Sequence, residues 1–353
     1  FWRDFERFLI YETAADDSRD RSVEGHQAFV AATEDLRSLV LRAFRRVSSN
    51  LQGHWPRVYR NVPAGVNMGL LVDKIDWTCP GGVYSFLKEI PFVRLASMQL
   101  PVVFYPRRNY RKGQFKPVTE NPLEGVSFDP SEWYCMPLNV GPLLILTFFH
   151  QEYLGLGSSL INLFELAGHN DARKQPDGIL VFGIEPGQLG EGETVFYEDD
   201  TQNLVVGAIS RCEDVDYFGY FKKMILTLHN IKMIKLGKMP FHGALINLAV
   251  RGHGRFTVLT LGDTGAGKSE MLEALRTLGS DEREDVTIIA DDMGSLGMDG
   301  QGRVLGYGTE TGAFVRLDDL KPGYAFGQID RTIIMSPAEV NARAVLPVTT
   351  YET

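Results

Sequence analysis

Hydrophobic residues in the N-terminal part of the chain follow two different spacings. In residues 28–47 they recur every three or four positions with charged residues between them, as on one face of an amphipathic helix. We therefore expect residues 1 to about 50 to be helical. From about residue 51 to 140 the hydrophobic runs are shorter, and proline and glycine interrupt them. That texture is typical of mixed α/β or mostly β structure.

The pattern is clearest after residue 178. Short hydrophobic runs predict strands at 178–184, 203–210, 243–250, 256–262, 286–292 and 331–336. Longer runs predict helices at 217–234 and 268–278, and residues 298–317 are typical of turns and short strands. A strand, a glycine-rich loop and a helix within a mixed sheet form an arrangement that binds nucleotides.

Composition limits the classes of partner. The chain of 353 residues has a formal net charge of −9 and a pI of about 5.4, so neither nucleic acid nor an anionic membrane has general electrostatic support. The longest hydrophobic stretch, 140–168, is interrupted by His150, Gln151 and Glu152, and we interpret it as buried core rather than a membrane span. Three widely spaced cysteines indicate no disulfide framework, so we expect a cytoplasmic protein.

The two ends of the chain give little information. It begins with Phe1 rather than Met and ends shortly after a hydrophobic run. The sequence therefore leaves open whether it is a portion of a longer protein and whether its C-terminal domain continues beyond residue 353.

Residues 262–269 match the phosphate-loop pattern G-x4-G-K-[ST] at every fixed position. Glycines let successive backbone N–H groups approach phosphate oxygens, Lys268 would lie near the β and γ phosphates, and Ser269 would offer an oxygen to a divalent metal. Because a predicted strand precedes the loop and a predicted helix follows it, we expect this chain to bind a nucleoside triphosphate. The predicted loop residues are Gly262, Asp263, Thr264, Gly265, Ala266, Gly267, Lys268, Ser269 and Glu270.

Acidic, imidazole and amine side chains flank the loop in sequence. Asp291 and Asp292 end a predicted strand, and acids at that position beside a phosphate loop can hold a metal or accept a proton. His242 lies just ahead of a predicted strand. Lys222 and Lys223 lie in the predicted helix 217–234. Taken alone, His242 and the lysine pair are more typical of structural or solvated positions.

Taken together, these residues resemble the ATP-dependent phosphoenolpyruvate carboxykinases. The order Tyr217-x-Gly219-x-x-Lys222-Lys223, then Met239-Pro240-x-His242, then the phosphate loop, then Asp291-Asp292 is similar to that family's order. Residues 307–317 and 340–347 resemble two further stretches of the family, so that the resemblance covers about residues 205 to 350.

The resemblance implies roles for individual residues. Lys223, His242 and Asp292 would bind Mn²⁺, with the lysine as a neutral amine, because neighbouring positive charges depress a lysine pKa. Lys268 and Ser269 would hold the phosphates of ATP and Mg²⁺, and Glu310 would lie near the nucleotide. Arg343 would stabilise the transferring phosphoryl group.

The chain also departs from that family. It has no T-G-R-S-P-K-D-K motif in residues 1–200, where the family carries the arginine that binds oxaloacetate. A basic cluster at 105–117, which we interpret as a solvated loop, is one possible source of such a cation. "HGALIN", "GDTGAGKSE" and "IADD" equally resemble HPr kinase/phosphorylase, a protein-serine kinase.

We therefore expect an α/β protein in two domains. Residues 201–353 would form a phosphoenolpyruvate-carboxykinase-like mixed sheet with the phosphate loop, and residues 1–200 a divergent α+β domain on the substrate side. The expected activity is divalent-metal-dependent transfer of the γ-phosphoryl group of ATP to a hydroxyl of a small molecule, such as a polyol or sugar. Asp291 or Asp292 would act as base or metal ligand. Carboxykinase activity, protein-serine phosphorylation and nucleotide sensing without turnover stay open, and a switch-type hydrolase is less favoured.

Overall fold

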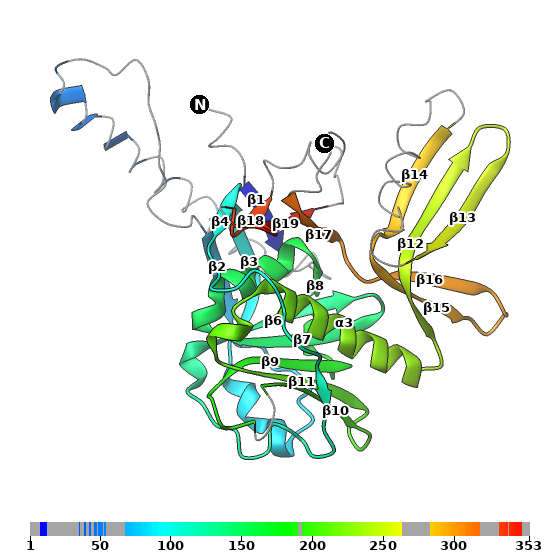
Figure 1. The fold of residues 1–353 in the computed structure, drawn as a ribbon, viewed down its shortest axis with the longest axis horizontal. Coiled ribbons are helices and arrows are strands. Elements are labelled where there is room, and N and C mark those ends of the chain that lie inside the picture. The colour runs from blue at the N-terminus through cyan, green and yellow to red at the C-terminus, as the bar shows by residue number, and fades with distance from the viewer. Residues whose placement is uncertain are drawn as a thin grey trace.

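The computed structural model describes residues 8–12, scattered positions between 35 and 53, and residues 68–189, 193–262, 283–317, 332–337 and 339–347. The described part is mixed α/β, with three sheets and few helices (Figure 1). None of its helices is long and apolar enough to cross a membrane.

A ten-stranded sheet forms the largest layer, in the order β1-β3-β6-β7-β9-β11-β10-β5, with β2 beside β3 and β8 beside β6. Its strands are β1 (Phe8–Glu12), β2 (Met68–Asp73), β3 (Phe92–Gln99), β5 (Lys116–Pro117), β6 (Trp133–Val140), β7 (Leu143–His150), β8 (Glu165–Leu166), β9 (Gly178–Ile184), β10 (Thr194–Asp199) and β11 (Leu204–Ser210). Every residue of β7, β9 and β11 is buried, and neighbours among these three strands run parallel. Buried central strands explain the uninterrupted hydrophobic runs in the sequence.

Helix α3 (Phe218–Lys235) covers one face of this sheet by packing on β9 and β11. The Phe221 ring stacks on Phe182 of β9 with centroids 3.8 Å apart. A second hydrophobic cluster fills the other face, under the short helix η2 (Gly82–Glu89). The other short helices are η3 (Pro130–Glu132), η4 (Gln151–Tyr153), α2 (Leu154–Ser159), η5 (Leu160–Asn162), η6 (Asp171–Arg173) and η7 (Glu213–Val215).

The C-terminal strands form two smaller sheets (Figure 1). The first contains β12 (Met239–Val250), β13 (Gly254–Leu261), β14 (Arg283–Ala290), β15 (Met293–Met298) and β16 (Val304–Gly308). The second contains β17 (Gly312–Arg316), β18 (Ile333–Met335), β19 (Arg343–Pro347) and β4 (Val102–Phe104), the last of which pairs in parallel with β18. Residues 102–104, from the N-terminal half of the sequence, are therefore part of a sheet whose other strands come from the C-terminal half.

The structure confirms the predicted strands after residue 178 and the helix at 217–234. The predicted helix at 268–278 lies outside the described residues. The expectation of helix throughout residues 1–50 is wrong at β1, which pairs antiparallel with β3. All five residues of its "FLIYE" stretch pair with residues of β3, and such tertiary pairing overrides local conformational preference. The described positions between 35 and 51 are helical. The expected domain boundary at residue 200 falls between β10 and β11, which pair with each other.

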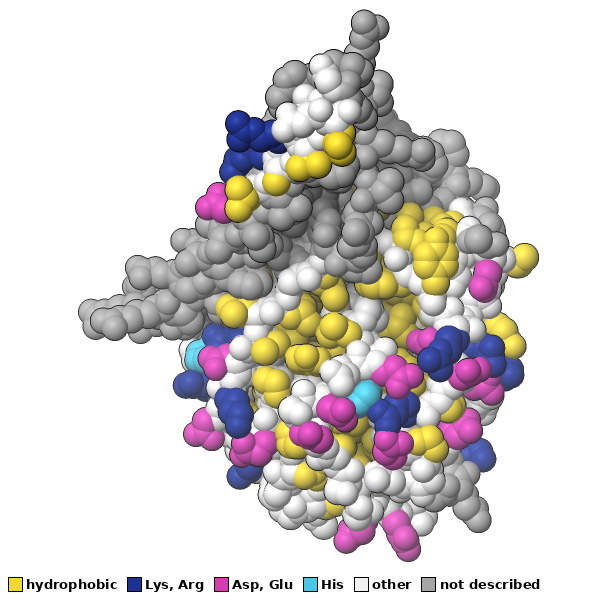
Figure 2. Space-filling model, turned by 90° about the vertical axis from the view of Figure 1, so that its left-hand side faces the viewer, with side chains coloured by type: hydrophobic (Ala, Val, Ile, Leu, Met, Phe, Trp, Pro, Cys, Tyr) yellow, Lys and Arg dark blue, Asp and Glu magenta, His cyan; other side chains and the backbone are white. Residues whose placement is uncertain are grey.

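The surface on one side of the molecule carries both signs of charge. Figure 2 shows Lys and Arg side chains interspersed with Asp and Glu side chains on this face. A duplex or single strand of nucleic acid binds best to a continuous basic surface, and the described residues of this face do not provide one. The expected lack of a nucleic-acid partner stays a prediction.

Candidate functional site

Three segments meet around the Nζ atom of Lys222, in the second turn of α3. Lys222 donates a hydrogen bond of 2.9 Å to Asp292 Oδ2, in the link between β14 and β15. It also forms an ion pair of 2.8 Å with Glu310 Oε1, in the link between β16 and β17. The side chains of Lys222 and Glu310 are only 5% and 6% exposed. A lysine this deeply buried needs such carboxylate partners to keep its charge.

Electrostatics within this group follow from burial and pairing. Burial opposes the charge on Lys222, but Glu310 and Asp292 outweigh it and raise the pKa of Lys222 above its ordinary value. Burial also opposes the charge on Asp292, yet Lys222, Lys223 and His242 lower the pKa of Asp292 well below its usual range. Burial raises the pKa of Glu310, because its desolvation exceeds the attraction to Lys222. Asp292 is thus held firmly as an anion.

His242 contacts the other oxygen of the same carboxylate. Its Nε2 atom lies 2.9 Å from Asp292 Oδ1, and both side chains remain about one-third exposed, at 34% and 35%. The residue belongs to β12, which starts at Met239 and pairs there with β15, so it lies within the strand rather than ahead of it. Gly243 N also donates to the Asp292 backbone carbonyl at 3.0 Å. Pairing of β12 with β15 therefore fixes His242 against Asp292.

Lys223 follows Lys222 in α3 but lies at the exposed surface of the helix. Desolvation by packed neighbours lowers the pKa of Lys223, and the positive charges of Lys222 and Arg111 lower it further, against the pull of Asp292. Desolvation, rather than the like charge expected from the sequence, is the larger cause of this lowering, and the neutral amine stays a prediction. Because Lys223 is exposed, solvent screens these charges.

Arg343, at the start of β19, lies near the first turn of α3. Its guanidinium carbon is 5.3 Å from the centroid of the Phe314 ring, and it interacts with the phenol of Tyr217. The Phe314 ring also lies 5.8 Å from Lys222 Nζ. An aromatic ring within about 6 Å of a cation makes a favourable electrostatic contact with it. Residues from β17, β19 and α3 thereby surround the ion-paired group.

The predicted phosphate-loop sequence begins beside His242. β13 pairs antiparallel with β12 so that Leu261 is opposite Gly243. Gly262, the first residue of the loop pattern, follows Leu261 and donates its N–H to the His242 carbonyl at 3.4 Å. The remaining predicted loop residues lie outside the described residues: Asp263, Thr264, Gly265, Ala266, Gly267, Lys268, Ser269 and Glu270.

The predicted metal ligands can be compared with this geometry. His242 and Asp292 present a nitrogen and an oxygen at contact distance, both reachable from solvent, and the Lys223 amine interacts with the same carboxylate. Nitrogen and carboxylate donors of this kind suit a divalent transition metal. Ser269 lies outside the described residues, and within those residues no group of three His, Cys, Asp or Glu side chains converges. The donor set fits a Mn²⁺ site only if the Lys223 amine contributes.

Sequence reasoning missed the central position of Lys222 and assigned Glu310 to the nucleotide. The missed signal was helical spacing, because Lys222 is four residues after Phe218 and three before Ile225, both buried. That spacing places Lys222 on the buried face of α3 and Lys223 away from it. Asp291, which follows β14 directly, is half-buried next to Asp292.

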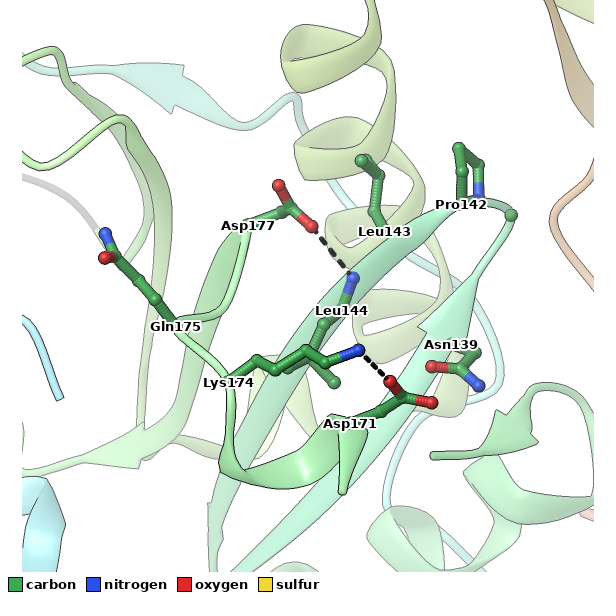
Figure 3. Close-up of a pocket in the computed structure, with 9 residues that line it drawn as sticks. Asn139, Pro142, Leu143, Leu144, Asp171, Lys174, Gln175 and Asp177 are labelled. Atoms are coloured by element: carbon green, nitrogen blue, oxygen red, sulfur yellow. Dashed lines mark hydrogen bonds and ion pairs between the residues drawn. The ribbon is translucent and has the colours of Figure 1, made fainter. Parts of the chain in front are cut away.

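A cavity of about 310 Å³ lies elsewhere, between the β6–β7 turn and η6 (Figure 3). Its charged residues are already engaged. Lys174 pairs with Asp171 at 2.5 Å, and Asp177 accepts from the Leu144 N–H at 3.1 Å. None of the residues predicted from the sequence lines it. We therefore assign no function to this cavity.

Comparison with models of known protein families gives no match to this chain, and comparison with curated proteins gives no significant match. The chemistry of the site is accordingly argued from its own residues.

Proposed function

We propose that this chain is a divalent-metal-dependent ATP phosphotransferase with a phosphoenolpyruvate-carboxykinase-like fold, and that its acceptor is a hydroxyl of a small molecule. One observation carries the proposal: β13 delivers the first residue of a phosphate-loop sequence next to the His242–Asp292 pair. A loop that cradles a triphosphate and a carboxylate–imidazole pair that attracts a cation are two parts that phosphoryl transfer requires.

The proposed binding roles follow the donor types. Lys223, His242 and Asp292 would hold Mn²⁺, and Ser269 would hold Mg²⁺ beside the phosphates that Lys268 and the loop bind. Bound cations neutralise the charge that develops on phosphate oxygens during transfer. Glu310 is reassigned, because a buried carboxylate in an ion pair with Lys222 is unsuited to contact an anionic nucleotide. Its role would be to position Lys222, which in turn orients Asp292.

The two neighbouring aspartates would have different tasks. In the transfer step the acceptor hydroxyl oxygen forms a bond to the γ phosphorus, the bond from that phosphorus to the β–γ bridging oxygen breaks, and ADP leaves. The hydroxyl proton must go to a base. Asp292 is a poor acceptor because its pKa is held far below neutral pH. Asp291 is therefore the proposed base, and Arg343 would stabilise the transferring group.

The test is transfer of label from γ-labelled ATP, with Mg²⁺ and Mn²⁺, to polyols, sugars and hydroxy acids. Asp292→Asn should lower the rate about 100-fold or more and weaken Mn²⁺ binding, measured independently by electron paramagnetic resonance. Lys268→Ala should weaken ATP binding. Asp200→Asn, a control at an exposed pair with Lys235, should change neither.

Three results would contradict the proposal. Label in phosphoenolpyruvate with release of CO₂ from oxaloacetate would identify a carboxykinase. Label on a protein serine would identify a protein kinase. Tight ATP binding without transfer to any acceptor would identify a nucleotide sensor.

A further inference from the structure

The basic segment 105–115 is not a freely solvated loop but packs beside the site. Lys112 N donates to the Tyr220 hydroxyl at 3.1 Å, and that hydroxyl in turn reaches the Lys112 carbonyl at 3.3 Å. Tyr220 lies in the first turn of α3, two residues before Lys222. The segment is thus joined to the helix that supplies both lysines of the site.

A second set of contacts joins the segment to the chain before β19. Asn109 Nδ2 donates to the Val340 carbonyl at 2.6 Å, and Asn341 Nδ2 donates to the Asn109 carbonyl at 2.5 Å. Arg343 is two residues beyond Asn341. The same loop therefore bridges the two elements that carry Lys223 and Arg343.

The basic side chains of the loop differ in their partners. Arg107 pairs with Glu152 and Glu213, and Arg108 and Lys112 both pair with Asp214. Arg111 has no carboxylate partner among the described residues; its Nη1 donates to the Gly113 carbonyl at 2.7 Å, and its guanidinium packs 4.9 Å from the Phe115 ring centroid.

Arg111 lies beside the first turn of α3, because the Phe115 ring on which it packs is 6.4 Å from the Tyr220 ring, measured between centroids. Its charge acts on both Lys223 and the Tyr217 phenol, the group with which Arg343 interacts. Arg343 likewise has no carboxylate partner among the described residues, whereas Lys222 has two. Two guanidinium groups, those of Arg111 and Arg343, therefore lie near Tyr217 without a carboxylate partner among the described residues. Such a concentration of positive charge favours binding of an anion.

We propose that the segment 105–115 forms the acceptor side of the site, and that Arg111 binds a carboxylate or phosphate group on the acceptor hydroxyl compound. This inference rests on the proposed phosphotransferase function and narrows its acceptor from a neutral polyol or sugar to an anionic hydroxyl compound. A guanidinium held by backbone and ring contacts is already oriented, so little side-chain entropy is lost when it binds an anion.

The test uses three acceptors with one carbon skeleton: glycerol, glycerate and glycerol 3-phosphate. Wild type, Arg111→Met and Lys112→Met are compared in transfer from γ-labelled ATP and in direct binding of all three compounds by calorimetry. Lys112→Met is the matched control, because Lys112 is an exposed basic residue adjacent to Arg111. Its hydrogen bond to the Tyr220 hydroxyl comes from the backbone N–H, so the substitution leaves that bond in place. Thermal melts check that each variant is folded.

We expect wild type to bind one or both anionic compounds more tightly than glycerol, and Arg111→Met to weaken that binding about 10- to 100-fold, as for loss of a charged hydrogen bond. KM for the anionic acceptor should rise by a similar factor, while KM for ATP changes much less. If the substitution weakens binding of glycerate, Arg111 binds a carboxylate; if it weakens binding of glycerol 3-phosphate, Arg111 binds a phosphate.

The two proposals fail separately. Transfer to glycerol with no preference for either anionic compound, or equal binding by wild type and Arg111→Met, would overturn the role of Arg111 while leaving a phosphotransferase. If anion binding depends on Arg111 but no phosphoryl group is transferred from ATP, the anion-binding role of Arg111 holds and the proposed phosphotransferase function is refuted.

Discussion

Replacing Lys222 by Met tests whether the buried ion-paired group supports the fold. Methionine has nearly the length of lysine but no charge, so the substitution leaves the Glu310 carboxylate, with a side chain only 6% exposed, without its partner. Removing one member of a buried pair costs about 3 to 5 kcal/mol, because the other charge stays desolvated. The pair with Asp292 adds less, since that carboxylate is about one-third exposed. We therefore expect a loss of about 3 kcal/mol in the free energy of unfolding at pH 8.

The loss should depend on pH in a defined direction. Burial already raises the pKa of Glu310 in the native protein, and removal of Lys222 raises it further. In the variant, the native state then holds a proton that the unfolded chain releases above the ordinary glutamate range. Stability consequently falls as pH rises through that window. In wild type the raised pKa of Lys222 keeps its contribution constant between pH 5 and 8. The difference between the two proteins should be larger at pH 8 than at pH 5.

The assay is urea unfolding followed by circular dichroism at both pH values. Lys223→Met is the matched control, because it removes the adjacent lysine from the exposed surface of α3. It should cost less than about 1 kcal/mol. The double variant Lys222→Met, Glu310→Gln should recover much of the loss, because it leaves no buried charge unpaired. Equal stability of Lys222→Met and wild type at pH 8, or strict additivity in the double variant, would refute the reasoning.

Two further predictions concern the fold. Gly308→Ala should destabilise the protein by about 1 to 3 kcal/mol in thermal melts, because an added Cβ would collide with the Ile289 carbonyl oxygen. Gly300→Ala is the control and should be nearly neutral, because its added Cβ meets nothing within 4 Å. Equal melting temperatures for the two variants would contradict the packing around Gly308. Tyr84→Phe should cost about 1 to 3 kcal/mol at pH 7, because the hydroxyl donates to Asp199 at 2.7 Å. That hydrogen bond helps to lower the pKa of Asp199 against burial, so the cost should shrink as pH falls and Asp199 is protonated; a cost that does not vary with pH would contradict this.

Much of the fold could be predicted from local patterns. Uninterrupted hydrophobic runs predicted β9 and β11 because central strands of a parallel arrangement are buried on both faces. The run that became α3 was predicted equally well, since its length and spacing suit a helix. β1 was not predicted, because its five residues gain their conformation from pairing with β3, more than eighty residues away in sequence.

Some features of the candidate site could likewise be predicted from the sequence, and others could not. The sequence by itself determined which chemical groups are present: a phosphate-loop pattern beginning at Gly262, His242, two aspartates and two adjacent lysines. It also determined the order of strand and loop, because that depends on neighbouring residues.

Only the tertiary structure decided which of these groups interact. Helical geometry turned Lys222 inward to two carboxylates and left Lys223 exposed, and strand pairing between β12 and β15 placed His242 on Asp292. Docking of residues 105–115 onto α3 placed Arg111 near residues that follow more than a hundred positions later. Packing and hydrogen bonding set the distances between side chains from remote segments. The pattern of residues along the sequence specifies neither.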